Sequence, residues 1–128
     1  MMEEWGEYIV SSGKRVRSSK PQITINKNGI ISFNSAFCKY YVDLKKIKGI
    51  ELYYFEKVNY LCFKIINETI TENAIKTNIV NKISFNISAN SFFIEIRKKS
   101  QELIGKYSPQ EKEINQLGKI YYIQLNKE

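Results

Sequence analysis

The residue types that carry most enzymatic chemistry are scarce in this sequence. The chain has no histidine, which excludes a Ser-His triad, a Cys-His pair and a histidine metal site. Its two cysteines, Cys38 and Cys62, form no Cys-x-x-Cys motif, so a cysteine zinc site and a disulfide-dense secreted scaffold are excluded as well. Both cysteines stand among apolar residues, and we expect them to pack in the core as reduced thiols.

Carboxylates and glycine-rich loops offer no better basis for catalysis. Metal-assisted phosphoryl chemistry needs two or more acids on one cation, but the chain has a single aspartate, Asp43. The clusters Glu3-Glu4 and Glu111-Glu113 fall in an expected tail and on an expected helix surface. None of the six glycines has the spacing of a phosphate-binding loop. We therefore expect a protein that is not an enzyme and that uses no cofactor or metal.

The positive charge is concentrated in one third of the chain. The 128 residues carry 20 Lys and Arg against 13 Asp and Glu, a net charge of +7. Residues 13–48 hold nine of these cations and only one acid, so this segment carries +8 and the remainder −1. The surface of a protein that has no charged partner usually mixes positively and negatively charged side chains. The asymmetry indicates an anionic partner, which we expect to be nucleic acid, DNA rather than RNA; lysine enrichment from AT-rich coding is the alternative explanation.

The candidate nucleic-acid-binding residues are the nine cations of this basic segment. They are Lys14, Arg15, Arg17, Lys20, Lys27, Lys39, Lys45, Lys46 and Lys48. Residues 1–20 are expected to form a flexible basic arm, since Ser and Gly favour flexibility and Pro21 disfavours helix before it. Such arms track phosphates or reach into a groove. We expect the remaining cations to share one face with the arm.

Aromatic residues on the predicted strands leave a second function open. They are Tyr53, Tyr54, Tyr60, Phe63, Tyr121 and Tyr122. In each adjacent tyrosine pair one ring faces away from the core, and exposed rings stack on unpaired bases in sheet-type single-strand binders. With interleaved cations such a protein would resemble Whirly-like folds. A third class is a protein-interaction module, such as an antitoxin or a mobile-element inhibitor, whose binding would be insensitive to salt.

Turn chemistry predicts a hairpin over residues 22–33 in the first half of the chain. A three-residue loop with a left-handed Gly29 sets Ile25 opposite Ile31 and Ile23 opposite Phe33, which buries one apolar face. A two-residue Asn-Gly turn would not do so.

Two further elements complete this half. A short helix capped by Asn34 or Ser35 follows and ends before Gly49. A second hairpin covers residues 50–66 and turns at residues 56–59, because β-branched and aromatic residues dominate both of its arms.

The pattern recurs about 52 residues further along the chain. Ile31-Ser32-Phe33-Asn34 is echoed by Ile83-Ser84-Phe85-Asn86, with an apolar strand and a polar turn before each copy. The second copy predicts a helix near 89–104 with Gly105 at its C-terminal cap. Ser108-Pro109-Gln110-Glu111 predicts a capping box and a short helix to Leu117. Residues 119–125 predict a closing strand.

Residues 22–66 combine a turn glycine, a short helix and a step into a second hairpin with apolar residues at fixed positions. These positions are Gly29 in the turn, Ile31 and Phe33 in the second strand, Phe37 in the helix, and Leu44, Gly49 and Leu52 at the step. In this pattern the segment resembles the swapped-hairpin barrel of AbrB-type regulators. Ile30 stands where that family usually carries an arginine. The resemblance implies a DNA-binding β-barrel made of two such units, both of which lie in one chain in MraZ-like members.

These observations predict a strand-rich α+β fold in which two strand-strand-helix-strand-strand units form one β-barrel-like domain. The arm would cover residues 1–20, and the domain residues 21–128, with related halves at 21–66 and 74–128. No stretch approaches the apolar length of a membrane span, and the N-terminus is acidic where a secretory signal begins basic. We expect a cytoplasmic, non-catalytic DNA-binding transcriptional regulator without membrane contact, for which a homodimer is an open option.

Overall fold

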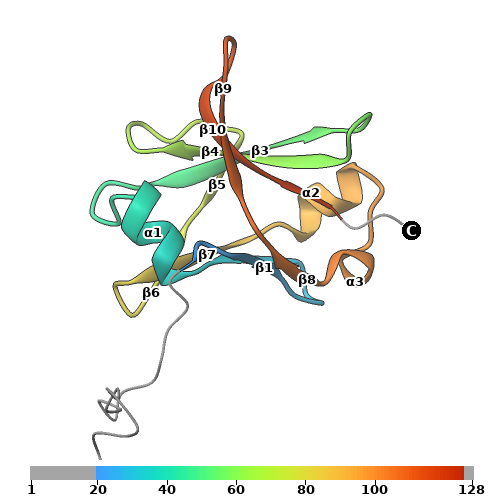
Figure 1. Ribbon diagram of the computed structural model, residues 1–128, viewed down its shortest axis with the longest axis horizontal. Helices are drawn as coiled ribbons and strands as arrows, with labels where there is room; N and C mark the ends of the chain where they lie inside the picture. The colour runs from blue at the N-terminus through green and yellow to red at the C-terminus, as the bar shows by residue number, and fades with distance from the viewer. Residues whose placement is uncertain (1–19, 126–128) are drawn as a thin grey trace, which may run out of the picture.

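A computed structural model describes residues 20–125, which form two antiparallel five-stranded sheets with short helices at both ends (Figure 1). One sheet, sheet A, has the order β6(Asn78–Val80), β7(Ser84–Ser88), β2(Ile30–Phe33), β1(Ile23–Ile25) and β8(Gly105–Tyr107). The other, sheet B, has the order β5(Ala74–Lys76), β3(Gly49–Phe55), β4(Tyr60–Ile66), β10(Gly118–Gln124) and β9(Gln110–Ile114). The predicted strand-rich α+β class is confirmed. Most of the predicted arm, including Lys14, Arg15 and Arg17, lies outside the described residues.

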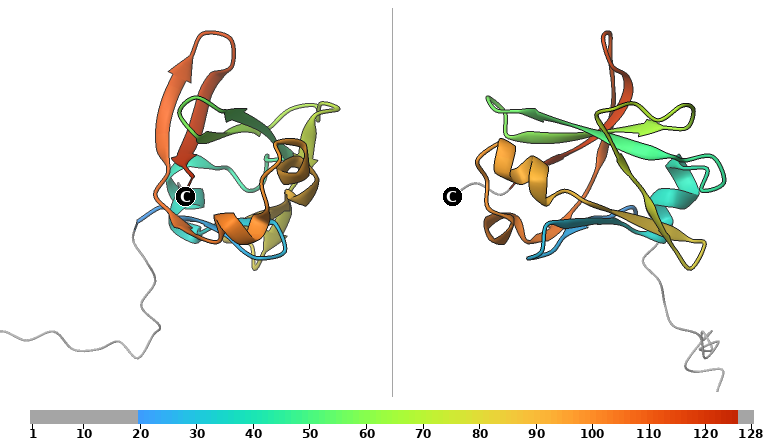
Figure 2. Two further views of the ribbon diagram at one scale, coloured as in Figure 1. Left: turned by 90° about the vertical axis from the view of Figure 1, so that its right-hand side faces the viewer. Right: turned by 180° about the vertical axis from the view of Figure 1, so that it is seen from behind.

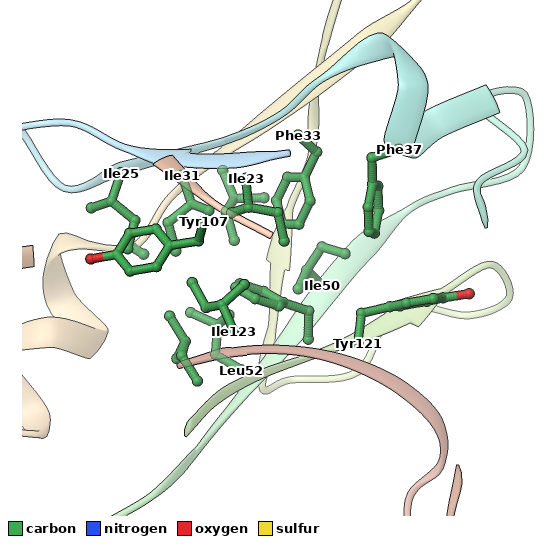
Figure 3. Close-up of a cluster of buried hydrophobic side chains, with 14 of the residues drawn as sticks. Ile23, Ile25, Ile31, Phe33, Phe37, Ile50, Leu52, Tyr107, Tyr121 and Ile123 are labelled. Atoms are coloured by element: carbon green, nitrogen blue, oxygen red, sulfur yellow. The ribbon is translucent and has the colours of Figure 1, made fainter. Parts of the chain in front are cut away.

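The core lies between the inner faces of the two sheets (Figure 3). Side chains of β1 and β2 face those of β3, β4 and β10 across this space, because alternate residues of each strand point inward. Phe33 is at the centre, stacked on Phe85 of β7 at 4.4 Å between ring centroids and edge-on to Phe63 of β4 at 5.2 Å. Helix α1(Ser35–Tyr41) lies at one end of the sandwich, and α2(Asn90–Glu95) and α3(Ser100–Leu103) lie at the other (Figures 1 and 2).

The first hairpin has the predicted register. Ile23 lies opposite Phe33 and Ile25 opposite Ile31, and all four side chains are buried. Gly29 adopts a left-handed φ of +78°, as the three-residue loop requires. A Cβ at this position would lie only 2.9 Å from the Cβ of Asn90, so the glycine also permits the close approach of α2.

Helix α1 and the second hairpin are confirmed as well. The Oδ1 of Asn34 accepts a hydrogen bond from the Phe37 N–H at 2.9 Å, which makes Asn34 the N-cap. Strands β3 and β4 pair from Gly49–Ile66 to Phe55–Tyr60, with the turn at residues 56–59 as predicted.

The predicted helix over 89–104 is wrong, because it is interrupted after one and a half turns. At the end of α2 the Lys98 N–H donates to the Phe93 carbonyl at 2.9 Å and the Arg97 N–H donates to the Ile94 carbonyl at 3.0 Å. This is a Schellman C-cap, in which Arg97 takes the left-handed position, with φ +60°, that glycine usually occupies. The chain then forms α3, and Gly105 begins β8 instead of capping a helix.

The predicted helix over 108–117 is also wrong. Residues 110–114 form β9, which pairs with β10 in a hairpin that extends beyond the sandwich (Figures 1 and 2). The Lys119 Nζ and Glu111 Oε2 form a cross-strand ion pair at 2.6 Å, and Gly118 turns the chain at φ +79°. Pairing with β10 at the edge of sheet B outweighed the local helix-capping signal at Pro109. The predicted closing strand over residues 119–125 is confirmed as β10.

The echoed segments lie side by side in sheet A. Strands β2 and β7 pair antiparallel, with Phe33 opposite Phe85 and Ile31 opposite Ile87. Sheet B likewise pairs β4 with β10 at its centre. The interpretation of the chain as two related halves stays a prediction, although this arrangement is one that two such halves would produce.

Candidate nucleic-acid interface

A groove of about 850 Å³ opens between α1 and the β6–β7 turn, and we call it the α1 groove. Figures 1 and 2 show these two elements next to each other at one end of the molecule. Its floor is mostly apolar and includes Ala36, Val42, Leu44, Ile79 and Ile83. Its lining also contains three cations from separate parts of the chain, Lys39, Lys45 and Lys82.

Helix α1 forms one wall of the groove, because one side of the helix is buried in the core and the other side faces outward. Ala36, Phe37 and Cys38 are buried, whereas Tyr40 is 60% exposed. The Lys39 ammonium lies 5.9 Å from the centre of the Tyr40 ring, within the range of a cation–π contact. The outward side of the helix thus presents one cation and one aromatic ring beside the groove.

The loop after α1 supplies the second group of cations. The Asp43 carboxylate accepts from the Lys45 N–H at 3.0 Å, and the Ile47 N–H donates to the Asp43 carbonyl at 3.0 Å. Ile47 is buried in the core, which anchors the loop and leaves Lys45, Lys46 and Lys48 exposed around it.

The β6–β7 turn supplies the third cation, which sequence reasoning missed. Asn81 and Lys82 both have positive φ, +53° and +64°, and the Ile83 N–H donates to the Val80 carbonyl at 3.1 Å. This is a type I′ turn, which favours glycine where Lys82 stands. A non-glycine residue held in this region is strained. Lys82 lies outside the basic segment, so charge counting along the chain gave no signal for it.

Among the described residues, the cations around the groove form no ion pairs with acids. Within residues 20–125, no carboxylate forms an ion pair with Lys45, Lys46, Lys48 or Lys82. The acid in the lining, Asp43, is engaged with the backbone of its own loop. The positive potential of these lysines is therefore available to an anionic ligand.

Lys20 and Lys27 do not line the groove. The Lys20 carbonyl accepts from the Asn34 Nδ2 at 3.0 Å, so the chain enters the fold beside the start of α1. Lys27 is in the β1–β2 turn, where its carbonyl accepts from the Ser100 Oγ at 2.8 Å. This turn lies by α3, at the opposite end of the molecule from α1 (Figure 1). The expectation of one shared face is wrong for Lys27, because the hairpin carries its turn the length of sheet A.

The outer face of sheet B carries a second candidate surface. Tyr53, Tyr60 and Tyr122 are partly exposed there, on three adjacent strands. The rings of Tyr60 and Tyr122 lie 4.8 Å apart, and both line a pocket of about 270 Å³ together with Lys106. The other aromatic residues of the predicted set are in or against the core: Tyr54, Phe63 and Tyr121.

A buried glutamate lies on the same outer face. The Glu51 carboxylate accepts hydrogen bonds from the Thr71 hydroxyl and from the Tyr53 hydroxyl, the latter at 2.6 Å. These bonds hold the pKa of Glu51 below its ordinary value, and the same carboxylate raises the pKa of Tyr53 to about 12. The Glu51 carboxylate is thus stabilised in its ionised form by two hydroxyl groups of the folded protein.

The cysteines are both free and buried, as predicted. Cys38 packs in the core cluster, whereas Cys62 lies on the other side of sheet B between Tyr53 and Tyr122. Burial raises the pKa of each thiol to about 11, so neither is an effective nucleophile at neutral pH.

Clusters of metal-ligating side chains and membrane-spanning helices are both absent from residues 20–125. No group of three or more Cys, Asp or Glu side chains in this range is placed to hold a metal ion. None of the helices in the range has the length and apolar character needed to cross a membrane.

Comparison of the chain with protein-family models, curated proteins and solved structures found no match.

Proposed function

We propose that this protein binds nucleic acid, without acting on it chemically, through the α1 groove and the lysines around it. The observation that carries the proposal is that Lys39, Lys45 and Lys82 line one groove, although they come from three separate elements, and that Lys45 and Lys82 have no acidic partner within the described range. Cations on one face sum to a potential that holds a polyanion, whereas scattered cations are screened by salt beyond about 10 Å.

The groove suits a polyanion that also carries apolar surface. Lysines at its edge match phosphates, and the apolar floor with the exposed Tyr40 matches sugars and base faces. Lys46 and Lys48, exposed in the same loop, extend the positive surface beyond the groove. A small DNA-binding regulator is the role that these features favour.

We also propose that residues 21–66 and 74–128 are related halves that together make one AbrB/MraZ-like, barrel-like domain. The antiparallel pairing of β2 with β7 and of β4 with β10 supports this, because a pseudo-twofold axis between two halves would bring equivalent strands together in this way. The opposed Phe33 and Phe85, which occupy the same position in the two echoed segments, support it further.

The function is tested by removing the groove cations in steps. Lys82→Gly removes one charge while relieving the strained φ of +64°, so weaker binding by this variant cannot be explained by unfolding. Lys39→Ala and Lys45→Ala complete the set. Lys57→Ala with Lys112→Ala, both exposed in other hairpins, is the control for the step in which two groove cations have been removed. We expect fluorescence anisotropy with labelled duplex DNA to show progressive loss of affinity in the groove series alone. Equal loss in the control pair would overturn the proposal.

Single-strand binding on sheet B is the second candidate, favoured by the three tyrosines on its outer face. Base stacking on an aromatic side chain is worth about 1–3 kcal/mol per base. Tyr60→Ala and Tyr122→Ala should then weaken binding of single-stranded oligonucleotides and leave duplex binding unchanged. Unchanged single-strand affinity in both variants would remove this candidate.

A further inference from the structure

We propose that residues 1–10 of this chain dock in the α1 groove and compete there with other anionic ligands. This inference concerns the chain itself and does not depend on nucleic-acid binding. The segment reads Met1-Met2-Glu3-Glu4-Trp5-Gly6-Glu7-Tyr8-Ile9-Val10, so it combines three carboxylates with aromatic and branched apolar side chains. The carboxylates complement the lysines of the groove, and the apolar side chains complement its apolar floor.

The chemistry of the groove is complementary to this segment. Its floor presents exposed apolar side chains, among them Ile79, 44% exposed, and Ile83, 38% exposed. Burying a large aromatic ring such as Trp5 there would remove apolar surface of both partners from water. Lys45 and Lys82, which form no ion pair with any acid of residues 20–125, would meet Glu3, Glu4 and Glu7 at the same groove.

The chain connection makes the groove reachable. The described structure begins at Lys20, whose carbonyl is hydrogen-bonded to the N-cap of α1, and Ser35 at the start of α1 lines the groove. Residues 11–19 separate the segment from this point, and nine extended residues span up to about 30 Å. A short linker also gives a tethered segment an effective concentration in the mM range, so a weak intrinsic affinity suffices for docking.

A second copy of the folded domain is a poorer occupant of the same groove. A twofold interface places the same patch of each copy against itself. The lysines at the groove would then face the lysines of the other copy, and like charges in such a position destabilise an interface. The acidic segment of the same chain meets no such repulsion.

The inference can be tested with the only tryptophan of the chain, Trp5. In the full chain without nucleic acid, we expect blue-shifted Trp5 emission and weak quenching by acrylamide. Lys45→Glu with Lys82→Glu should shift the emission to that of a water-exposed indole and raise the quenching. Lys57→Glu with Lys112→Glu, the same charge change on distant hairpins, should leave both readings unchanged.

A second variant protects the test against misfolding of the groove. Glu3→Gln, Glu4→Gln and Glu7→Gln together alter no residue of the described fold, and they should also shift the emission to the red and raise the quenching by acrylamide. Wild-type emission typical of exposed indole, or emission unaffected by either variant, would overturn the inference. Emission that depends on protein concentration would do so too, because it would show docking on another copy. None of these results bears on whether nucleic acid binds.

Discussion

Asn34 joins three segments through one amide side chain. Its Oδ1 accepts from the N–H groups of Phe37 and Gln22, and its Nδ2 donates to the Lys20 carbonyl. The same residue therefore caps α1, holds the start of β1 and fixes where the chain enters the fold. Sequence reasoning identified Asn34 as a capping candidate from its type alone, but the bonds to residues 20 and 22 depend on tertiary structure.

Asn34→Ala should lower the free energy of unfolding by about 1–2 kcal/mol, because the cap and the link to β1 are both lost. Asn34→Asp keeps the accepting oxygen and should cost less. Urea denaturation measures both, with Asn115→Ala in the exposed β9–β10 turn as the control. An Asn34→Ala variant as stable as the control would show that the cap contributes little.

Glu51 should make stability dependent on pH. Hydrogen bonds from Thr71 and Tyr53 lower its pKa from the ordinary 4.5, so the ionised form stabilises the folded state. That stability is fully present above pH 4.5 and is lost as the pH falls through the lowered pKa. The difference in unfolding free energy between wild type and Glu51→Gln should therefore be largest near neutral pH and shrink below about pH 4.5. A difference that stays constant from pH 7 to pH 3 would contradict this account.

At the scale of elements, the hairpins could be predicted and the helices of the second half could not. The loop glycine Gly29 and alternating apolar residues are local signals, and they gave the register of β1 with β2. Helix α2 ends where Arg97 adopts a left-handed conformation, and an arginine in the sequence does not predict that conformation. Strand β8 pairs with β1, which is far away in the sequence, and β9 forms only as the edge strand beside β10, so propensity alone could not identify them.

Arg97→Gly should raise the free energy of unfolding by about 1 kcal/mol, since glycine adopts the left-handed conformation without the steric cost borne by arginine. Arg97→Ala removes the same charge and keeps the strain, so it should give no gain. Urea denaturation of the two variants separates backbone strain from electrostatics. Equal stabilisation by both would show that the arginine charge, and not the conformation, is unfavourable.

At the scale of the whole molecule, the site was only partly predictable. Charge counting found Lys39 and Lys45, which do line one groove. It grouped Lys27 with them, although the hairpin places that residue at the other end of the fold. It omitted Lys82, because only the fold brings the β6–β7 turn next to α1. Linear charge density thus predicted part of the groove lining but not all of its cations.

The arm cations Lys14, Arg15 and Arg17 lie outside the described residues, and their role stays a prediction. If they contact phosphates, replacing all three by alanine should weaken binding similarly for different DNA sequences and lower the salt slope by up to about 0.9 per lost contact. Titration of two unrelated duplexes at several salt concentrations measures both effects. An unchanged slope in the triple variant would show that the arm does not touch phosphates.

The salt dependence of DNA binding shows whether the lysines of the α1 groove contact phosphates. The association constants of wild type and of Lys39→Ala/Lys45→Ala/Lys82→Gly would be measured for duplex and single-stranded DNA from low to moderate salt. Log K should fall linearly with log salt, and the slope should be smaller by about 2–3 in the variant, because each lost phosphate contact removes about 0.7–0.9. The same slope for wild type and variant, or no binding at low salt, would show that the groove lysines do not hold nucleic acid.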